Sequence, residues 1–177
     1  MKQSALLLIL VLIISRLYEL YLSKANERLL LSQYGAKLMT TTKEHYWVVI
    51  FHVLWFVGLI VEHSYFPSTY QMSAFFTFLA YLCLCIAQIM RWESMRSLGV
   101  FWTTKLYYSN KWTKVTTGIY KYFNHPSYIA VMIEFIVVPM LLGAFYTLIV
   151  FFIFNLFLLL NRMKIETKFL NNHSEAL

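Results

Sequence analysis

The sequence contains no aspartate, and all eight of its acidic residues are glutamates. Any mechanism that depends on an aspartate is therefore excluded. Only two cysteines occur, Cys83 and Cys85, and both lie inside an apolar run. Because residues two apart point to different sides of a helix, we interpret them as small packing residues. The five histidines show no spacing typical of a zinc site, so we expect no bound metal.

Charge is scarce as well: 13% of the residues are charged, whereas 60% are hydrophobic. A water-soluble domain of 177 residues rarely carries so much apolar sequence, so the composition predicts an all-α integral membrane protein. The length predicts one domain, 1–177, with three spans in 1–90 and a loop, a helical hairpin and a tail in 91–177. The apolar stretch 1–15 lacks a small-residue cleavage site, which favours a retained span over a signal peptide.

Five hydrophobic segments are predicted to be transmembrane helices: 4–21, 46–62, 70–90, 128–142 and 145–160. A helix needs about 20 residues to cross a bilayer core, and the first three segments meet this length. The last two are shorter and are joined at 143–144. We therefore predict that they form a short helical hairpin.

Of the 15 lysines and arginines, 13 gather in three regions, 22–45, 91–127 and the tail after 160, whereas 63–69 and 143–144 carry none. The positive-inside rule then places these three regions in the cytoplasm and the N-terminus outside. Cations confined to loops between apolar runs fit an anionic membrane face better than nucleic acid. We expect a lipid membrane as partner, no nucleic acid, and a functional site on the cytoplasmic side.

The stretch KYFNHPSYIA, 121–130, places polar groups at the start of an apolar segment. Pro126 suits the first turn of a helix, and Asn124 and His125 precede it as candidate caps. The free N–H groups of a helix N-terminus, together with a histidine, favour a carboxylate or a phosphate. We therefore predict the edge of a binding pocket here.

A second polar element is NRMKIETKFL, 161–170, at the end of the last apolar segment. Arg162 and Glu166 are four residues apart and share a helix face. They could form a surface ion pair worth less than about 1 kcal/mol. Alternatively, they line the same pocket as 121–130, because a hairpin would bring the two elements together.

The motifs TTGIYKYFNHPSY, 116–128, and RMKIET, 162–167, resemble the isoprenylcysteine carboxyl methyltransferase family. The segments 15–30, 35–56 and 97–104 resemble a bacterial branch of it, which is associated with type III polyketide synthases and O-methylates alkylpyrones. Three positions depart from the family pattern: Asn124 replaces an arginine, Ala130 a glycine, and Thr167 a second glutamate.

The resemblance implies an enzyme of the cell membrane that binds S-adenosyl-L-methionine and releases S-adenosyl-L-homocysteine. Arg162 would orient the acidic oxygen, enol or carboxylate, of a lipophilic acceptor that enters from the bilayer. The acceptor would be an alkylpyrone or an isoprenylcysteine, and a functional link to a type III polyketide synthase is implied. The implied cofactor contacts are Trp112, Thr113, Lys114, Val115, Tyr120, His125, Pro126, Ser127, Tyr128 and Glu166.

Other polar residues lie in the apolar segments. A carboxyl group inside a membrane is costly, so Glu134 either contacts the substrate in its neutral form or pairs with Asn155 or His52. We expect His52 to hydrogen-bond another helix. Arg16 and Glu19 are expected to form a structural cluster with His45 or Glu44. Glu62 and His63, at the outer boundary, are expected to be solvated.

Two other classes of function remain open from sequence. Membrane sterol reductases have related C-terminal regions but use NADPH, whose 2′-phosphate requires a cluster of basic residues; within two residues of Glu166 only Lys164 and Lys168 are basic. A non-catalytic membrane scaffold would not require His125 or Glu166.

Overall fold

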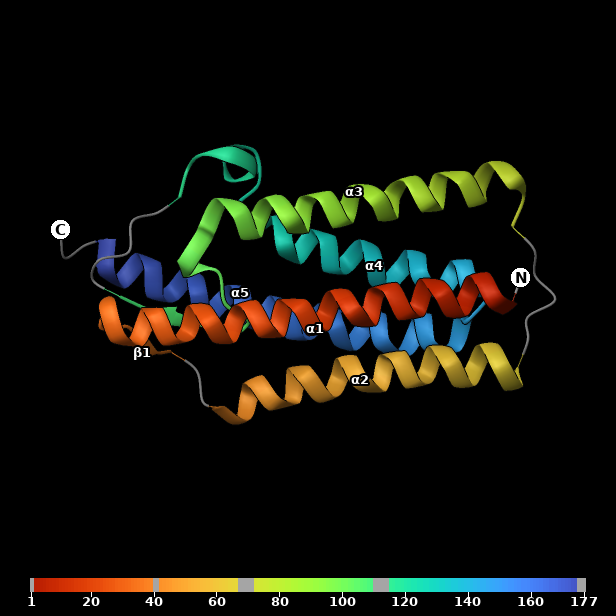
Figure 1. Ribbon diagram of the computed structural model, residues 1–177, viewed down its shortest axis with the longest axis horizontal. Helices are drawn as coiled ribbons and strands as arrows, with labels where there is room; N and C mark the ends of the chain where they lie inside the picture. The colour runs from red at the N-terminus through yellow and green to blue at the C-terminus, as the bar shows by residue number, and fades with distance from the viewer. Residues whose placement is uncertain (1, 40–41, 67–71, 110–114, 175–177) are drawn as a thin grey trace.

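A computed structural model of the chain describes residues 2–39, 42–66, 72–109 and 115–174. These residues form five α-helices that lie lengthwise in one bundle (Figure 1). Short elements lie between the helices, and β1 and β2 pair antiparallel. The elements are α1 (Lys2–Gln33), β1 (Lys37–Leu38), α2 (Thr42–Tyr65), α3 (Ala74–Leu98), η1 (Gly99–Phe101), β2 (Tyr107–Tyr108), η2 (Gly118–Lys121), α4 (Pro126–Leu142) and α5 (Phe145–Ser174). The predicted all-α fold is confirmed.

The shortest helix, α4, packs against both α3 and α5, while α2 packs mainly on α5. Aromatic rings join α2 to α4: the ring centroids of Trp55 and Phe135 are 4.3 Å apart, and those of Phe51 and Phe135 are 5.8 Å apart. Trp55 and Phe135 are almost fully buried. Stacked rings of this kind stabilise a core beyond the area that they bury.

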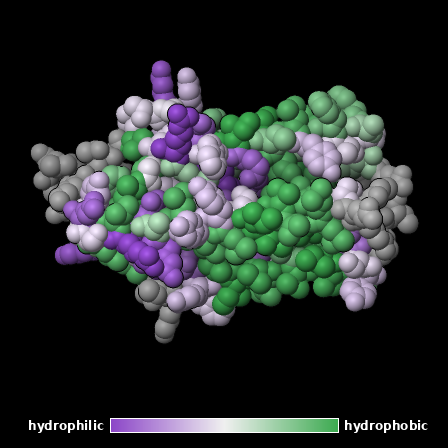
Figure 2. Space-filling view, viewed as in Figure 1, coloured by the Kyte–Doolittle hydropathy of each residue, from purple (hydrophilic) through white to green (hydrophobic). Residues whose placement is uncertain are grey.

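The outer surface of the bundle is apolar. Four helices, α1, α2, α3 and α5, are long and apolar enough to cross a membrane, and α4 is a shorter apolar helix. Only 11% to 28% of the residues in their most apolar windows are buried within the protein. Figure 2 shows this hydrophobic surface, with most hydrophilic residues gathered at one end of the bundle. The chain is thus an integral membrane protein with four candidate spans.

The helices are longer than their apolar segments. Helix α1 extends to Gln33, α3 to Leu98 and α5 to Ser174, whereas the predicted segments ended at 21, 90 and 160. An apolar run marks only the part of a helix that contacts lipid. Beyond that part, these helices continue and make polar contacts with other segments of the protein. Asn26 of α1, for example, donates to the carbonyl oxygens of Gly99 and Trp102. The expected short hairpin is therefore wrong in its second arm: α4 is short, but α5 has 30 residues.

The turn between α4 and α5 is held by the end of α2, which corrects the expectation that Glu62 and His63 are solvated. Glu62 is buried and accepts hydrogen bonds from the backbone N–H groups of Tyr146 and Thr147, at 2.9 and 2.7 Å. The ring Nδ1 of His63 lies 2.9 Å from the carbonyl oxygen of Leu142. Two consecutive residues thus cap the start of α5 and the end of α4.

Two smaller expectations are also wrong. The Nδ1 of His52 lies 2.8 Å from the carbonyl oxygen of Val48 on its own helix, and its ring packs edge-on against Phe135 rather than hydrogen-bonding another helix. Cys83 is partly exposed and Cys85 is exposed, so neither is a buried packing residue. Both thiols belong to the apolar outer surface of α3.

Candidate functional site

The start of α4 is built by the sequence that precedes it. Pro126 is buried in the first turn, and His125 stands before it with a non-helical backbone. The backbone N–H groups of Tyr128 and Ile129 both donate to the carbonyl oxygen of His125. The rings of His125 and Tyr128 stack, with centroids 5.3 Å apart and planes 6° from parallel. This first turn therefore presents two parallel rings beside a helix N-terminus.

The phenol of Tyr128 connects this turn to α5. Its hydroxyl donates a hydrogen bond of 3.1 Å to Oε2 of Glu166, and Nδ1 of His125 lies 3.5 Å from the same oxygen. The structure thus brings the segment 125–128 next to Glu166, although Tyr128 and Glu166 are 38 residues apart in the sequence. About one third of the Glu166 side chain remains exposed. Among the described residues, its Oε1 accepts no hydrogen bond, so it is available to a ligand.

Arg162 lies one turn before Glu166 on α5 but does not pair with it among the described residues. Its Nη2 donates a 2.7 Å hydrogen bond to the carbonyl oxygen of Thr104, and its Cζ lies 6.0 Å from the centroid of the Tyr128 ring. Thr104 is itself held by Ser23 of α1, through its backbone N–H and its hydroxyl. The guanidinium is thereby fixed between the loop and the ring of Tyr128.

The residues before α4 are anchored on α3. The hydroxyl groups of Tyr120 and Ser94 are 2.8 Å apart. Burial raises the pKa of the Tyr120 phenol, so it stays protonated. Gly118 has a φ of +61°, and a Cβ there would lie 2.5 Å from Oγ of Ser97. The positive φ favours glycine, and any larger residue would also force the Ser97 hydroxyl to move, which accounts for the glycine of the TTGIY motif.

The remaining expected cofactor contacts divide into two groups. Trp112, Thr113 and Lys114 lie outside the described residues. Val115 is partly buried in an irregular segment, Pro126 is buried, and Ser127 follows it in the first turn of α4. The described contacts with Glu166 therefore come from His125 and Tyr128.

Glu134 does not belong to this group and pairs with neither Asn155 nor His52. Its carboxylate receives both Nη2 hydrogen bonds of Arg16, at 2.7 and 2.6 Å, and one from Gln88 at 2.6 Å. Arg91 lies 2.9 Å from it. Asn155 instead donates to the sulfur of Met132. Two helices, α1 and α3, therefore converge on one carboxylate of α4.

Arg16 and Glu19 belong to the same network, not to a cluster with His45. Nη1 of Arg16 lies 2.7 Å from Glu19, and Nη1 of Arg91 lies 3.2 Å from the same carboxylate. Together with the contacts of Glu134, these pairs close a ring in which arginine and glutamate alternate. We call Arg16, Glu19, Arg91 and Glu134 the charge ring. The side chain of Glu44 is outside the described set.

The charge ring was missed from sequence because its pairs come from three helices. At most 14% of each side chain in it is exposed. Gln88 and Arg91, three residues apart in an apolar helix, were the available signal, as were Arg16 and Glu19. A buried charge is stable only when it is paired, so charged residues in apolar helices predict that partners exist. They do not show which residues these partners are.

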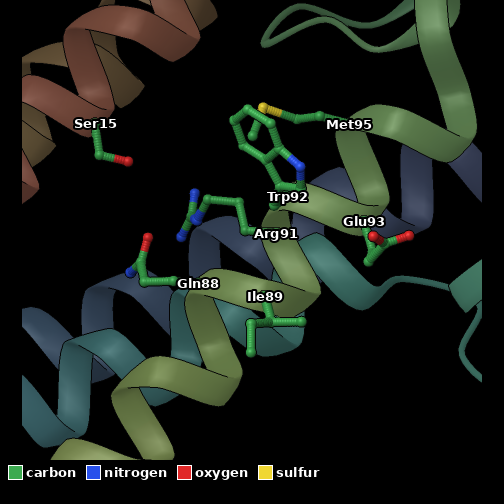
Figure 3. A pocket seen from close by; sticks show the side chains of 7 residues that line it. All are labelled: Ser15, Gln88, Ile89, Arg91, Trp92, Glu93 and Met95. Atoms are coloured by element: carbon green, nitrogen blue, oxygen red, sulfur yellow. The ribbon is translucent and has the colours of Figure 1, made fainter.

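Two cavities lie beside these groups. One, of about 400 Å³, is lined by Thr104, the residue whose carbonyl receives Arg162, and by charged residues of α1 that include Lys24 and Glu27. The other, of about 450 Å³, lies against α1 and α3 and is lined by Arg91 and Gln88 (Figure 3). The first cavity borders the loop whose Thr104 accepts the hydrogen bond of Arg162, and the second borders the charge ring.

Comparison with known proteins gives two matches. The sequence profile of the isoprenylcysteine carboxyl methyltransferase (ICMT) family matches residues 78–172, a range that contains α4 and the contacts of Glu166. The uncharacterized protein YpbQ of Bacillus subtilis (strain 168) is 34% identical over 169 residues, which cover 95% of this chain and 97% of that protein. No solved structure matches.

Proposed function

This chain belongs to the isoprenylcysteine carboxyl methyltransferase family, and we propose that it transfers a methyl group from S-adenosylmethionine to an acidic oxygen of a lipophilic acceptor. The observation that carries this proposal is the hydrogen bond between Tyr128 and Glu166, at 3.1 Å. It joins the two segments that contain the polar motifs of the chain, and both segments lie within the range that matches the family.

The residues at this site fit the donor. S-adenosylmethionine, when bound, supplies a methyl group on a positively charged sulfur. Oε1 of Glu166 can accept hydrogen bonds from sugar hydroxyls, and the stacked rings of His125 and Tyr128 offer aromatic faces to a cation. The N–H groups at the start of α4 favour a carboxylate. We propose Trp112, Thr113, Lys114, Val115, Tyr120, Pro126 and Ser127 as the further contacts.

Arg162 has the role of orienting the acceptor in this proposal. Its Nη2 is held by the carbonyl of Thr104, and the other guanidinium N–H groups can donate to an oxyanion. An acceptor oxygen that is already ionised needs no general base. The apolar surface around the bundle would deliver a lipophilic acceptor sideways from the bilayer. Exclusion of water at the site would favour the transfer, because the charges of the acceptor oxyanion and the sulfonium cancel as the methyl group moves.

The end of the bundle that holds 162–166 faces the cytosol in this proposal. The lysines and arginines of 22–45, 91–127 and the tail favour that orientation by the positive-inside rule. The donor would then reach Glu166 from the aqueous cytosol, while the acceptor arrives from the bilayer.

Calorimetric titration of the detergent-purified chain with S-adenosylhomocysteine tests the proposal. We expect one binding site, about 10- to 100-fold weaker binding in Glu166→Gln because a charged hydrogen-bond acceptor is lost, and no response to NADPH. Glu93→Gln is the matched control, since Glu93 pairs only with Arg96 on the surface of α3 among the described residues. Binding of NADPH in place of S-adenosylhomocysteine would overturn the proposal.

A second measurement identifies the reaction. Membranes that contain the chain are incubated with methyl-labelled S-adenosylmethionine and a lipid extract, and the lipids are separated by mass. We expect a labelled lipophilic product that Glu166→Gln membranes do not form and Glu93→Gln membranes do. Equal labelling in membranes that lack the chain would contradict the assignment.

A further inference from the structure

The cavity between α1 and α3 is lined by none of the residues proposed to bind the methyl donor. It measures about 450 Å³ and is lined by Ser15 of α1 and by Gln88, Ile89, Arg91, Trp92, Glu93 and Met95 of α3. In Figure 2 a hydrophilic patch lies between α3 and α1, where the hydrophilic end of the bundle meets the hydrophobic surface. We call this cavity the α1–α3 groove. None of its lining residues contacts Glu166 or Tyr128 among the described interactions.

Polar groups converge inside the groove. In Figure 3 the side chains of Ser15, Gln88 and Arg91 point toward one another. Gln88 uses its amide N–H to bind Glu134, so its amide oxygen is the end available to a donor. Nε of Arg91 is buried and has no hydrogen-bond partner among the described residues. A buried donor without a partner destabilises the protein, and a ligand oxygen that accepts from it would remove that cost.

The charge ring determines which oxygen suits this position. Arg16 and Arg91 are balanced by Glu19 and Glu134 within hydrogen-bonding distance. An anionic head group beside the ring would add an uncompensated charge, and burying such a charge is unfavourable. A cationic head group meets the same penalty at the ring, because the remaining carboxylate that lines the groove, Glu93, is partly exposed and lies 3.7 Å from Arg96, which already balances its charge. An uncharged hydroxyl, which both accepts and donates, matches Nε of Arg91 and the amide oxygen of Gln88.

The walls of the groove suit an aliphatic chain. Trp92 is 56% exposed and stacks on Tyr18 at 6.3 Å, as aromatic residues do at the polar boundary of a bilayer. Because α1 and α3 run parallel (Figure 1), the residues before Ser15 and those before Gln88 lie on the same side of the level at which Ser15 and Gln88 stand. These stretches expose Leu10, Ile14 and Ile86.

We infer that the α1–α3 groove binds a long-chain amphiphile with an uncharged hydroxyl head group, its oxygen bonded to Arg91 and Gln88 and its chain along α1 and α3. This inference goes beyond the proposed methyl transfer, because it uses none of the donor-binding residues. The ligand lies within the bilayer and approaches from the side.

The test uses the full chain reconstituted in phosphatidylcholine vesicles. Three photoreactive probes share one alkyl chain with a diazirine and differ only in the head group: an alcohol, a carboxylate and an amine. We expect saturable labelling of 7–15 and 82–89 by the alcohol, at least about fivefold above that by the other two probes, as one matched hydrogen bond implies. Equal labelling by the three probes would overturn the inference.

Two variants locate the site. Ile89→Trp fills the groove and should lower alcohol labelling at least about fivefold, whereas Ile153→Trp on α5 should leave it unchanged. Ile89 and Ile153 are each 62% exposed, so the two changes are matched. Ser15→Ala removes a groove hydroxyl without adding bulk, and we expect a loss of about fivefold from it as well. Unchanged labelling in Ser15→Ala and Ile89→Trp would reject the groove, and S-adenosylhomocysteine binding should be the same in all three variants.

Discussion

The hydroxyl of Tyr128 donates a 3.1 Å hydrogen bond to Glu166, and this single contact links the first turn of α4 to the polar part of α5. The same carboxylate oxygen lies 3.5 Å from His125, whose ring stacks on Tyr128. Position and orientation of Glu166 therefore depend on two side chains from one helical turn. Removal of either partner should release a carboxylate that we propose to bind the methyl donor.

Tyr128→Phe removes this hydrogen bond while keeping the ring stacked on His125. We expect about 10-fold weaker binding of S-adenosylhomocysteine, since a hydrogen bond to a charged group contributes about 1.5–3 kcal/mol, and an unchanged melting temperature within a few degrees. Calorimetric titration measures the first quantity. Tyr146→Phe, at an exposed position on α5, is the control. Equal affinities in the two variants would show that Tyr128 does not position Glu166.

Arg162→Lys separates acceptor binding from donor binding. A compact ammonium cannot keep the hydrogen bond to Thr104 and also present a planar set of donors beside Tyr128. We expect methyl incorporation into lipid to fall about 10-fold or more, while the affinity for S-adenosylhomocysteine stays within about threefold. Lys164→Arg, an exposed change on the same helix, should alter neither value. A parallel loss of donor affinity would place Arg162 in the donor site instead.

Glu62→Ala should destabilise the fold without touching the proposed site. It removes the acceptor of two backbone N–H groups at the start of α5, and loss of a helix cap costs about 0.5–2 kcal/mol. Thermal unfolding in detergent, followed by circular dichroism, should show a lower midpoint. Glu62→Gln keeps one acceptor oxygen, so its unfolding midpoint should lie between that of the unchanged protein and that of Glu62→Ala. If Glu93→Ala lowers the midpoint equally, the cap is not the cause.

Within the charge ring, single and paired changes should differ in a characteristic way. Glu134→Gln leaves Arg16 and Arg91 with an excess positive charge, for which we expect a loss of about 3–5 kcal/mol. Addition of Arg16→Met restores the balance between Glu19 and Arg91, so the double variant should unfold at a higher temperature than Glu134→Gln alone. Strictly additive losses would contradict this account of the ring.

The local features of this protein were predictable from sequence because they depend on neighbouring residues. Long apolar runs without charges predicted membrane helices, and Pro126 after His125 marked the start of α4. Arg162 and Glu166 were predicted to share a helix face. The proximity of 125–128 to 166 also followed in outline, since a two-residue turn leaves α5 no path except back along α4.

Tertiary structure alone decided which polar groups meet. Glu134 was expected to pair with His52 or Asn155, but the rotation of α1 and α3 about their axes places Arg16, Gln88 and Arg91 against it. Glu62 and His63 looked solvated because their partners are backbone groups of α4 and α5, which no side-chain pattern reveals. Hydropathy fixes which residues contact lipid, whereas the pairing of buried charges depends on how three helices are set against one another.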